Sequence, residues 1–211
     1  IPRDDTCAVA DLAIHKALFL DKDPRILDLC CGSGCIGLAI ASRVKDAKVT
    51  LADISQKALA VAKENVNLNK LSGRVRCVAA DALKPAFPFL GKYDMIVSNP
   101  PYITTEEMKQ LPGSVADFEP HLALHGGADG LDFYRAITEN FKETLKPGGY
   151  LCFEFGMGQG DAVCAIGDPL GAEFRGTYTD GIVSAINRDV EVDGRTMNLI
   201  QTNAALNTGN S

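Results

Sequence analysis

The stretch that decides the fold is residues 25–34, RILDLCCGSG. Its first half is an apolar run broken by one aspartate, which is typical of a strand buried on both faces. Gly32 and Gly34 then allow a tight turn, because glycine accepts backbone angles that other residues avoid. Residues 35–44 are mostly apolar and predict a helix. A buried strand, a glycine turn and a helix together indicate an α/β domain.

The same alternation of strand and helix continues along the chain. We expect helices at 6–20, 35–44, 55–69, 129–145 and 156–166, and strands at 25–30, 48–53, 74–80, 93–97, 150–155, 174–179 and 196–202. Continuously apolar strands alternating with helices predict a mostly parallel sheet, here of seven strands, with helices on both faces. We expect one domain over residues 1–205, followed by a frayed polar tail at 206–211.

Composition excludes several classes of protein. The chain has 211 residues, of which 46% are apolar, so it can build a full core. Its net charge of −6 argues against wholesale wrapping of nucleic acid. No run approaches the roughly 18 apolar residues of a membrane span, and no signal-peptide pattern opens the chain. We therefore expect a soluble, cytoplasmic protein.

The seven cysteines predict reduced thiols, because their number is odd and most lie in apolar runs. Cys30, Cys31 and Cys35 are close enough in sequence to raise a metal site, but zinc takes about four ligands and no histidine lies near them in sequence. His121 and His125 are four residues apart, but the proline and glycines around them favour a loop. We expect no metal centre.

A second stretch, residues 98–102 (SNPPY), follows the apolar strand expected at 93–97. The two prolines end the strand ladder, and Pro100 pushes Asn99 toward an extended backbone. The Asn99 oxygen and the Pro100 carbonyl can accept the two N–H groups of a planar NH2 group, while Tyr102 packs flat against it. We predict that Asn99, Pro100, Pro101 and Tyr102 are catalytic. The alternative is a plain Pro-Pro turn with a solvent-facing tyrosine.

The glycine turn and the aspartates that follow it indicate a nucleoside-containing ligand. Asp53 ends the second strand about twenty residues after the turn, where a carboxylate can accept from ribose hydroxyls. Asp81 ends the third strand on the same edge of the sheet and, with the backbone of Ala82, could meet an adenine edge. For both aspartates the alternative is a helix cap. The glycine pattern also fits a nicotinamide-dependent oxidoreductase, which would leave the SNPPY stretch without a role.

Longer motifs carry a family resemblance. Residues 27–34 resemble the S-adenosylmethionine loop of class I methyltransferases, which have a Rossmann-like fold. Residues 99–102 resemble the signature of enzymes that methylate planar amino or amide nitrogens, including adenine-N6 and cytosine-N4 DNA methyltransferases. Residues 96–103 (IVSNPPYI), 118–124 (FEPHLAL) and 126–135 (GGADGLDFYR) are similar to the bacterial release-factor glutamine methyltransferases, the PrmC or HemK family.

This resemblance implies a function and a set of roles. The chain is expected to transfer a methyl group from S-adenosylmethionine to a glutamine side-chain nitrogen of a peptide chain release factor, leaving S-adenosylhomocysteine. Asn99 through Tyr102 would hold the glutamine. The residues implied in cofactor binding are Cys30, Cys31, Gly32, Ser33, Gly34, Asp53, Asp81, Ala82 and Asn99. The partner is then the release factor, with no membrane, no stable nucleic-acid binding and a monomeric state.

The alternative is an amino-methyltransferase acting on adenine or cytosine in nucleic acid. That reaction needs a pocket for a flipped base and a target-recognition region, and the sequence shows no such region and no basic stripe.

Three departures from the family stand out. The lead reads RDDTC at residues 3–7, where the family reads Arg-Pro-Asp-Thr-Glu. Ala82 replaces a frequent aromatic residue, and the chain begins where the family's catalytic domain begins, without the N-terminal helical domain. We expect residues 103–128 to cover the substrate.

Overall fold

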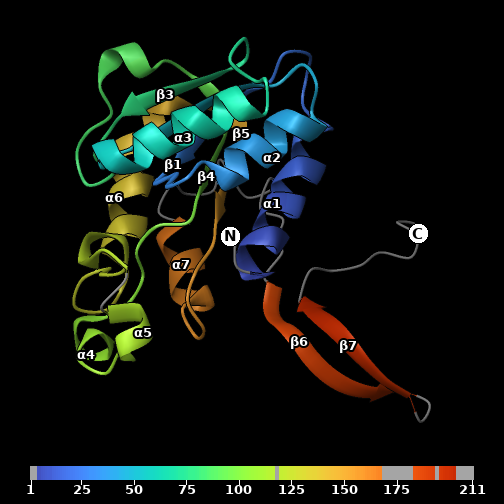
Figure 1. The fold of residues 1–211 in the computed structure, drawn as a ribbon, viewed down its shortest axis with the longest axis vertical. Coiled ribbons are helices and arrows are strands. Elements are labelled where there is room, and N and C mark those ends of the chain that lie inside the picture. The colour runs from blue at the N-terminus through green and yellow to red at the C-terminus, as the bar shows by residue number, and fades with distance from the viewer. Residues whose placement is uncertain (1–3, 117–118, 168–182, 193–194, 203–211) are drawn as a thin grey trace.

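The computed structural model describes residues 4–116, 119–167, 183–192 and 195–202. Strands and helices alternate along most of the chain (Figure 1). In chain order the elements are α1 (Asp4–Ala17), β1 (Arg25–Leu29), α2 (Cys35–Arg43), β2 (Lys48–Asp53), α3 (Gln56–Leu68), β3 (Val75–Ala79), η1 (Pro88–Leu90), β4 (Tyr93–Ser98), α4 (Thr105–Met108), α5 (Gly113–Ala116), η2 (His121–Ala123), α6 (Asp132–Phe141), η3 (Lys142–Thr144), β5 (Leu145–Phe153), α7 (Gly160–Gly167), β6 (Val183–Val192) and β7 (Arg195–Thr202).

Five strands form one parallel sheet in the order β3-β2-β1-β4-β5. The strand order reverses between β1 and β4, which lie side by side with Leu29 opposite Ser98. Ligands of open α/β sheets bind beyond the carboxyl ends of the strands at such a reversal. The glycine turn after β1 and the SNPPY loop after β4 therefore meet at one crevice.

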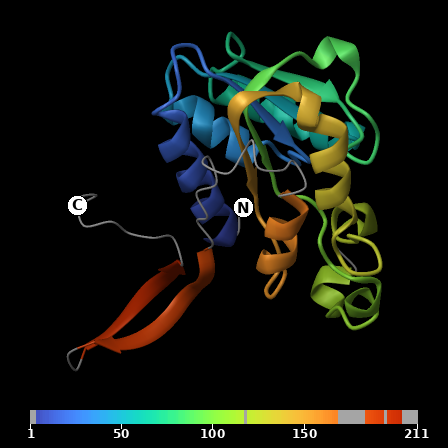
Figure 2. The ribbon, with the colours of Figure 1, turned by 180° about the vertical axis from the view of Figure 1, so that it is seen from behind.

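The prediction of a seven-stranded sheet is wrong. Among the residues that the structure describes, the parallel sheet has five strands, and β6 and β7 pair with each other as a separate antiparallel pair (Figures 1 and 2). Two strands separated by only two residues in sequence can pair locally, whereas a parallel pair needs a long crossover. The strand expected at 196–202 is confirmed as part of β7. The strand expected at 174–179 and the tail at 206–211 lie outside the described residues.

Strand β5 begins earlier than predicted. Residues 146–149, which precede the strand expected at 150–155, form an irregularity inside β5: Tyr93 pairs with Leu145, and the next paired residue, Met95, lies opposite Tyr150. Such an insertion bends a strand without ending it. The edge that faces the candidate site is unaffected, because the ladder continues regularly to Ser98 opposite Phe153.

Two apolar cores cover the two faces of the sheet, as predicted. Alternate strand residues point to opposite faces, so Ile26, Val49 and Leu51 pack with helices α1, α2 and α3. Leu27 and Leu29 pack on the other face with helix α6. The two views show these helices on opposite sides of the sheet (Figures 1 and 2). Across the described ranges, no helix is both long and apolar enough to span a membrane.

Candidate active site

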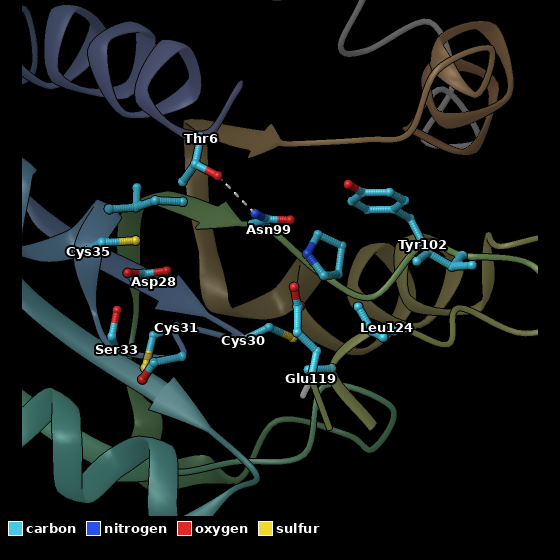
Figure 3. Close-up of a pocket in the computed structure, with 15 residues that line it drawn as sticks. Thr6, Asp28, Cys30, Cys31, Ser33, Cys35, Asn99, Tyr102, Glu119 and Leu124 are labelled. Atoms are coloured by element: carbon cyan, nitrogen blue, oxygen red, sulfur yellow. Dashed lines mark hydrogen bonds between the residues drawn. The ribbon is translucent and has the colours of Figure 1, made fainter. Parts of the chain in front are cut away.

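A cavity of about 370 Å³ opens at the carboxyl edge of the sheet, where β1 and β4 end (Figure 3). Its walls come from the turn after β1, the loop after β4, the first turn of α1 and the segment between β4 and α6. Most of the residues predicted from sequence lie around it. Those that line it are Cys30, Cys31, Gly32, Ser33, Asn99, Pro100 and Tyr102.

Three predicted residues have a packing role and do not line the cavity. Gly34 adopts φ +81° before helix α2, and a Cβ there would lie 2.7 Å from a methyl group of Leu51. Ala82 is buried in the core that contains α6. Pro101 is buried, and its carbonyl oxygen lies close to the backbone of Gly126. Gly34 and Pro101 therefore shape loops that border the cavity, whereas Ala82 belongs to the core.

Asp53 lies outside the cavity and supports its glycine turn. One carboxylate oxygen accepts the N–H of Gly32 at 2.8 Å, and the other accepts the N–H of Ser55 at 2.8 Å. The second bond closes a local turn before α3 and does not cap the helix, because the N-cap is Ser55, whose hydroxyl accepts the N–H of Ala58 at 3.3 Å. A carboxylate has about four acceptor positions, so two remain for ribose hydroxyls.

Asp81 also lies outside the cavity, and its visible contacts are local. It accepts the N–H of Leu83 at 3.0 Å and forms an ion pair with Lys84 at 3.3 Å. This is the turn geometry that aspartate commonly makes with the residue two positions on. Its charge nevertheless helps to raise the pKa of the Cys30 thiol, together with the charges of Asp53 and Asp28. The carboxyl edge of β1, β2 and β3 is therefore an acidic environment.

Asp28 is a site residue that the sequence analysis missed. It is buried in β1 and lines the cavity, and one oxygen accepts the N–H of Gly37 at 2.8 Å. Its other oxygen has no hydrogen-bond partner among the described residues. Burial raises the pKa of this carboxyl to about 7, the Gly37 N–H lowers it and the charge of Asp53 raises it. The signal in the sequence was a carboxylate inside an otherwise apolar strand.

The orphaned oxygen of Asp28 tests whether S-adenosylmethionine fits this cavity. An unpartnered buried acceptor costs about 1–3 kcal/mol, and more for a charged group. An ammonium group carries three donors and no acceptor, so it satisfies such an oxygen. The methionine end of the cofactor carries this group. The donor and acceptor pattern of the cavity therefore fits the cofactor that the glycine turn predicts.

Asn99 projects its side chain into the cavity from the loop after β4 (Figure 3). Its side-chain nitrogen donates to the hydroxyl of Thr6, in the first turn of α1, at 3.3 Å. The amide oxygen points away from Thr6, toward the side of the cavity that holds the Tyr102 ring (Figure 3). Asn99 thus presents its amide oxygen toward the cavity, while Thr6 accepts one of the two N–H groups of the amide.

Tyr102 is fixed by contacts from later in the chain. Its carbonyl oxygen accepts from the side-chain nitrogen of Gln159 at 3.0 Å, and the Gln159 oxygen accepts the N–H of Gly156 at 3.0 Å. The ring packs against the apolar cluster that includes Leu131 and Tyr134. These contacts connect the SNPPY loop to the segment after β5.

The segment expected to cover the substrate forms one wall of the cavity. Glu119 and Leu124 line it, with Ile103 at the start of the segment. Ile103 donates its N–H to Leu124 at 2.9 Å and accepts the N–H of Gly126 at 2.8 Å. This pairing ties the wall to the loop that carries Asn99.

Three cysteines line the cavity as neutral thiols. Burial, followed by the charge of Asp53, raises the pKa of Cys30 to about 12. Burial also raises the pKa of Cys31 and of Cys35. Because the thiolate is the nucleophilic form, these side chains do not act as nucleophiles near neutral pH. Among the residues that the structure describes, no cluster of histidine, cysteine or carboxylate side chains is arranged to hold a metal ion.

Gly130 gives a first testable prediction about this architecture. It has φ +75°, and a Cβ there would overlap the Tyr102 carbonyl oxygen and the Gln159 side-chain nitrogen. Gly148 has the same φ, but no described atom lies within 4 Å of its Cβ position. We expect Gly148→Ala to cost about 1–2 kcal/mol of stability from backbone strain alone. Gly130→Ala should cost more and should also slow catalysis, because it displaces Tyr102.

Urea unfolding measures the loss of stability in each variant, and initial rates of the catalysed reaction measure the loss of activity. Equal losses of stability, with equal rates, would show that the contacts around Tyr102 do not constrain the site.

Comparisons with known proteins agree with the fold. The family model described as the methyltransferase small domain matches residues 12–114. The solved structure of TrmN from Thermus thermophilus superposes with a TM-score of 0.55 at 23% identity, covering 76% of this chain and 40% of that one. At that identity the likeness shows the fold alone, which is that of class I methyltransferases.

Curated relatives narrow the family. The chain is 42% identical over 166 residues to the release factor glutamine methyltransferase of Clostridium acetobutylicum, covering 79% of this chain and 58% of the relative. It is 41% identical over 140 residues to the ribosomal protein uL3 glutamine methyltransferase of Francisella tularensis, covering 66% of this chain and 44% of the relative. The chain thus spans less than two thirds of these relatives. With its parallel sheet and its glycine turn facing an Asn-Pro-Pro-Tyr loop, it belongs to the class I methyltransferases, in the family of the release factor glutamine methyltransferases.

Proposed function

We propose that this protein transfers a methyl group from S-adenosylmethionine to the side-chain amide nitrogen of a glutamine in a peptide chain release factor. The observation that carries the proposal is the joining of two half-sites in one cavity. The Asn99 loop presents its amide oxygen to the cavity. The glycine turn and Asp28, which has an unpartnered carboxylate oxygen, line the same cavity. The first half suits a planar amide, and the second suits the methionine end of the cofactor.

The residues around the glycine turn would hold the cofactor. The turn from Cys30 to Gly34 would cradle the methionine part, with Asp28 accepting from its ammonium group. Asp53 would accept from the ribose hydroxyls, and Asp81 with Ala82 would lie beside the adenine. When bound, S-adenosylmethionine supplies an electrophilic methyl group on a positively charged sulfur. The acidic environment of this edge favours a cationic ligand, and the protonated cysteines do not compete for the methyl group.

The Asn99 loop would hold and orient the glutamine. A side-chain amide nitrogen is a poor nucleophile, because its lone pair is delocalised into the carbonyl. The Asn99 oxygen and the Pro100 carbonyl would accept its two N–H groups and direct the nitrogen toward the glycine-turn side of the cavity. Holding reactants at attack distance can lower a barrier by several kcal/mol. Acceptors placed where positive charge grows on the nitrogen stabilise that charge, and the proton can then pass to water.

Two other substrates are outcomes that the test must separate. One is a glutamine of a ribosomal protein, because the name of the Francisella relative gives uL3 as its substrate. The other is an amino group of adenine or cytosine in nucleic acid, which the net charge of −6 disfavours. A release factor acts in translation, so we expect the reaction to take place in the cytoplasm. We also expect the enzyme to be monomeric.

The test is to incubate the protein with radiolabelled S-adenosylmethionine and, in separate reactions, a release factor, ribosomal protein uL3, duplex DNA and ribosomal RNA. We expect label on the release factor. Label on uL3 alone would keep the chemistry and change the partner, whereas label on DNA or RNA would overturn the proposal.

Asp53 gives a second prediction, on cofactor affinity. Asp53→Ala removes the acceptors for the ribose and frees the N–H of Gly32 that shapes the turn. We expect the affinity for S-adenosylmethionine to fall by about tenfold or more, since hydrogen bonds to a charged group contribute about 1.5–3 kcal/mol. Isothermal titration calorimetry measures it, with Asp129→Ala on an exposed ion pair as the control. Unchanged affinity in Asp53→Ala would remove Asp53 from the cofactor site.

A further inference from the structure

We propose that Thr6 is a positioning residue for methyl transfer, whose hydroxyl holds the side-chain amide of Asn99 in the orientation that receives the substrate. This inference rests on the proposed function and extends it to the first helix of the chain. Nothing in the sequence pattern connects these two residues, which lie 93 positions apart and meet only in the fold.

The buried face of helix α1 first shows that Thr6 is unusual there. Thr6, Ala10, Ala13 and Ala17 are all buried, with exposed fractions of 6%, 8%, 0% and 1%. Their spacing of four, three and four residues places them on one face of the helix. The three alanines pack in the core beneath α1 and α2. Thr6 is therefore a polar residue on a buried face otherwise made of alanine.

A buried hydroxyl needs a hydrogen-bond partner, because leaving it unpaired costs free energy. The partner that the structure gives Thr6 is the side-chain nitrogen of Asn99 at 3.3 Å, drawn as the dashed line in Figure 3. The contact lies at the cavity, which both residues line. A residue that served packing alone could be alanine, like its neighbours along the helix.

The contact constrains the group that matters for the reaction. The last torsion of an asparagine side chain is broad, so the side chain itself does not fix the plane of its amide. With its nitrogen held by Thr6, the amide keeps its oxygen toward the cavity, where an N–H of the glutamine would arrive. In the reversed orientation two NH2 groups would face each other, and neither has an acceptor to offer. By accepting from the Asn99 nitrogen, the Thr6 hydroxyl keeps the amide in the productive orientation.

The first test compares three variants in methyl transfer to a release factor. Thr6→Val keeps the shape and removes the hydroxyl, and Thr6→Ser keeps the hydroxyl. Thr138→Val is the matched control, because Thr138 is also buried, at 8% exposure, and lies on α6 away from the cavity lining. We expect Thr6→Val to lower kcat by about tenfold, with S-adenosylmethionine affinity within about twofold of wild type. Thr6→Ser and Thr138→Val should stay near wild type.

A double-mutant cycle distinguishes positioning from a general loss of structure. If Thr6 acts through Asn99, then Thr6→Val should have no further effect on kcat in an Asn99→Ala background. An independent readout is the side-chain NH2 resonance pair of Asn99 in the free protein, identified by its loss in Asn99→Ala. We expect the two proton shifts to be well separated in wild type and to move together in Thr6→Val.

Each outcome bears on one claim. Wild-type kcat in Thr6→Val, additive effects in the cycle, or unchanged Asn99 resonances would overturn the positioning role. Failure of the wild-type protein to methylate any glutamine would instead contradict the proposed function, and the resonance measurement would still decide whether Thr6 holds the Asn99 amide.

Discussion

Asn99→Ala is expected to lower kcat for methyl transfer by at least about a hundredfold, the effect of removing one preorganised polar group from a transition state. Alanine removes the oxygen that would accept one N–H of the substrate. Of the two proposed acceptors, the carbonyl of Pro100 then remains. It leaves the glycine turn and Asp28 in place, because the contact that the structure records for the Asn99 amide is with Thr6. S-adenosylmethionine affinity should therefore stay within about twofold of wild type.

Single-turnover rates and calorimetric titration of the same preparations measure the two quantities. Asn69→Ala is the control, because this exposed amide lies at the end of α3 and bonds to the carbonyl of Asn65. Loss of cofactor affinity in Asn99→Ala, with the fold intact, would move Asn99 from the substrate to the cofactor. A wild-type rate would remove it from the reaction.

Asp28→Asn is expected to weaken S-adenosylmethionine binding by about 10- to 100-fold at pH 8, the range for hydrogen bonds to charged groups. The asparagine oxygen can still accept the N–H of Gly37, while its NH2 group replaces the carboxylate oxygen that has no hydrogen-bond partner among the described residues. An ammonium group then meets a donor where it needs an acceptor. Calorimetry at fixed pH gives the ratio of affinities, and equal affinities would exclude Asp28 from the cofactor site.

The pH dependence of Asp28 provides a second test of the same residue. Burial raises its pKa to about 7, so the carboxyl is protonated in the folded protein below that pH. Because the ionised form would accept from the ammonium group, cofactor affinity should increase as the pH rises, by up to about tenfold per unit below 7. Asp28→Asn should lack this component of the dependence. A wild-type affinity that did not change between pH 6 and 8 would contradict the role.

The stability of the ligand-free protein should change in the opposite direction. A carboxyl whose pKa is raised by folding contributes stability that is fully present below its unfolded pKa, near 4, and is lost as the pH rises through about 7. Wild type should therefore lose stability between about pH 4 and 7 relative to Asp28→Asn, measured by urea unfolding at each pH. A parallel pH dependence in the two proteins would show that Asp28 does not titrate in this range.

The parts of the site that could be predicted from sequence are those determined by local chemistry. The apolar run at 25–29, the glycines after it and the prolines after β4 each specify a local structure, and parallel strands bring their carboxyl ends to one edge. That placed the glycine turn and the Asn99 loop at the same edge of the sheet, and the pairing of β1 with β4 in the structure brings them together. The resemblance of the motifs to glutamine methyltransferases is confirmed by the relatives.

The parts that could not be predicted depend on contacts between distant residues. The contact of Thr6 with Asn99 requires α1 to pack on α2 at one particular position, and no local pattern specifies it. The raised pKa of Asp28 depends on complete burial, which the sequence suggests only through its apolar neighbours. The pairing of β6 with β7 was missed because no strand was predicted over residues 183–192, and strand propensity does not name a partner.

The most direct test of the central claim is tandem mass spectrometry of a release factor after incubation with this protein and S-adenosylmethionine. We predict one added methyl group on the side-chain nitrogen of a glutamine, present with the wild-type protein and the Asn69→Ala control and absent with Asn99→Ala. A methyl group on any other kind of side chain, or one that persists undiminished in Asn99→Ala, would contradict the account.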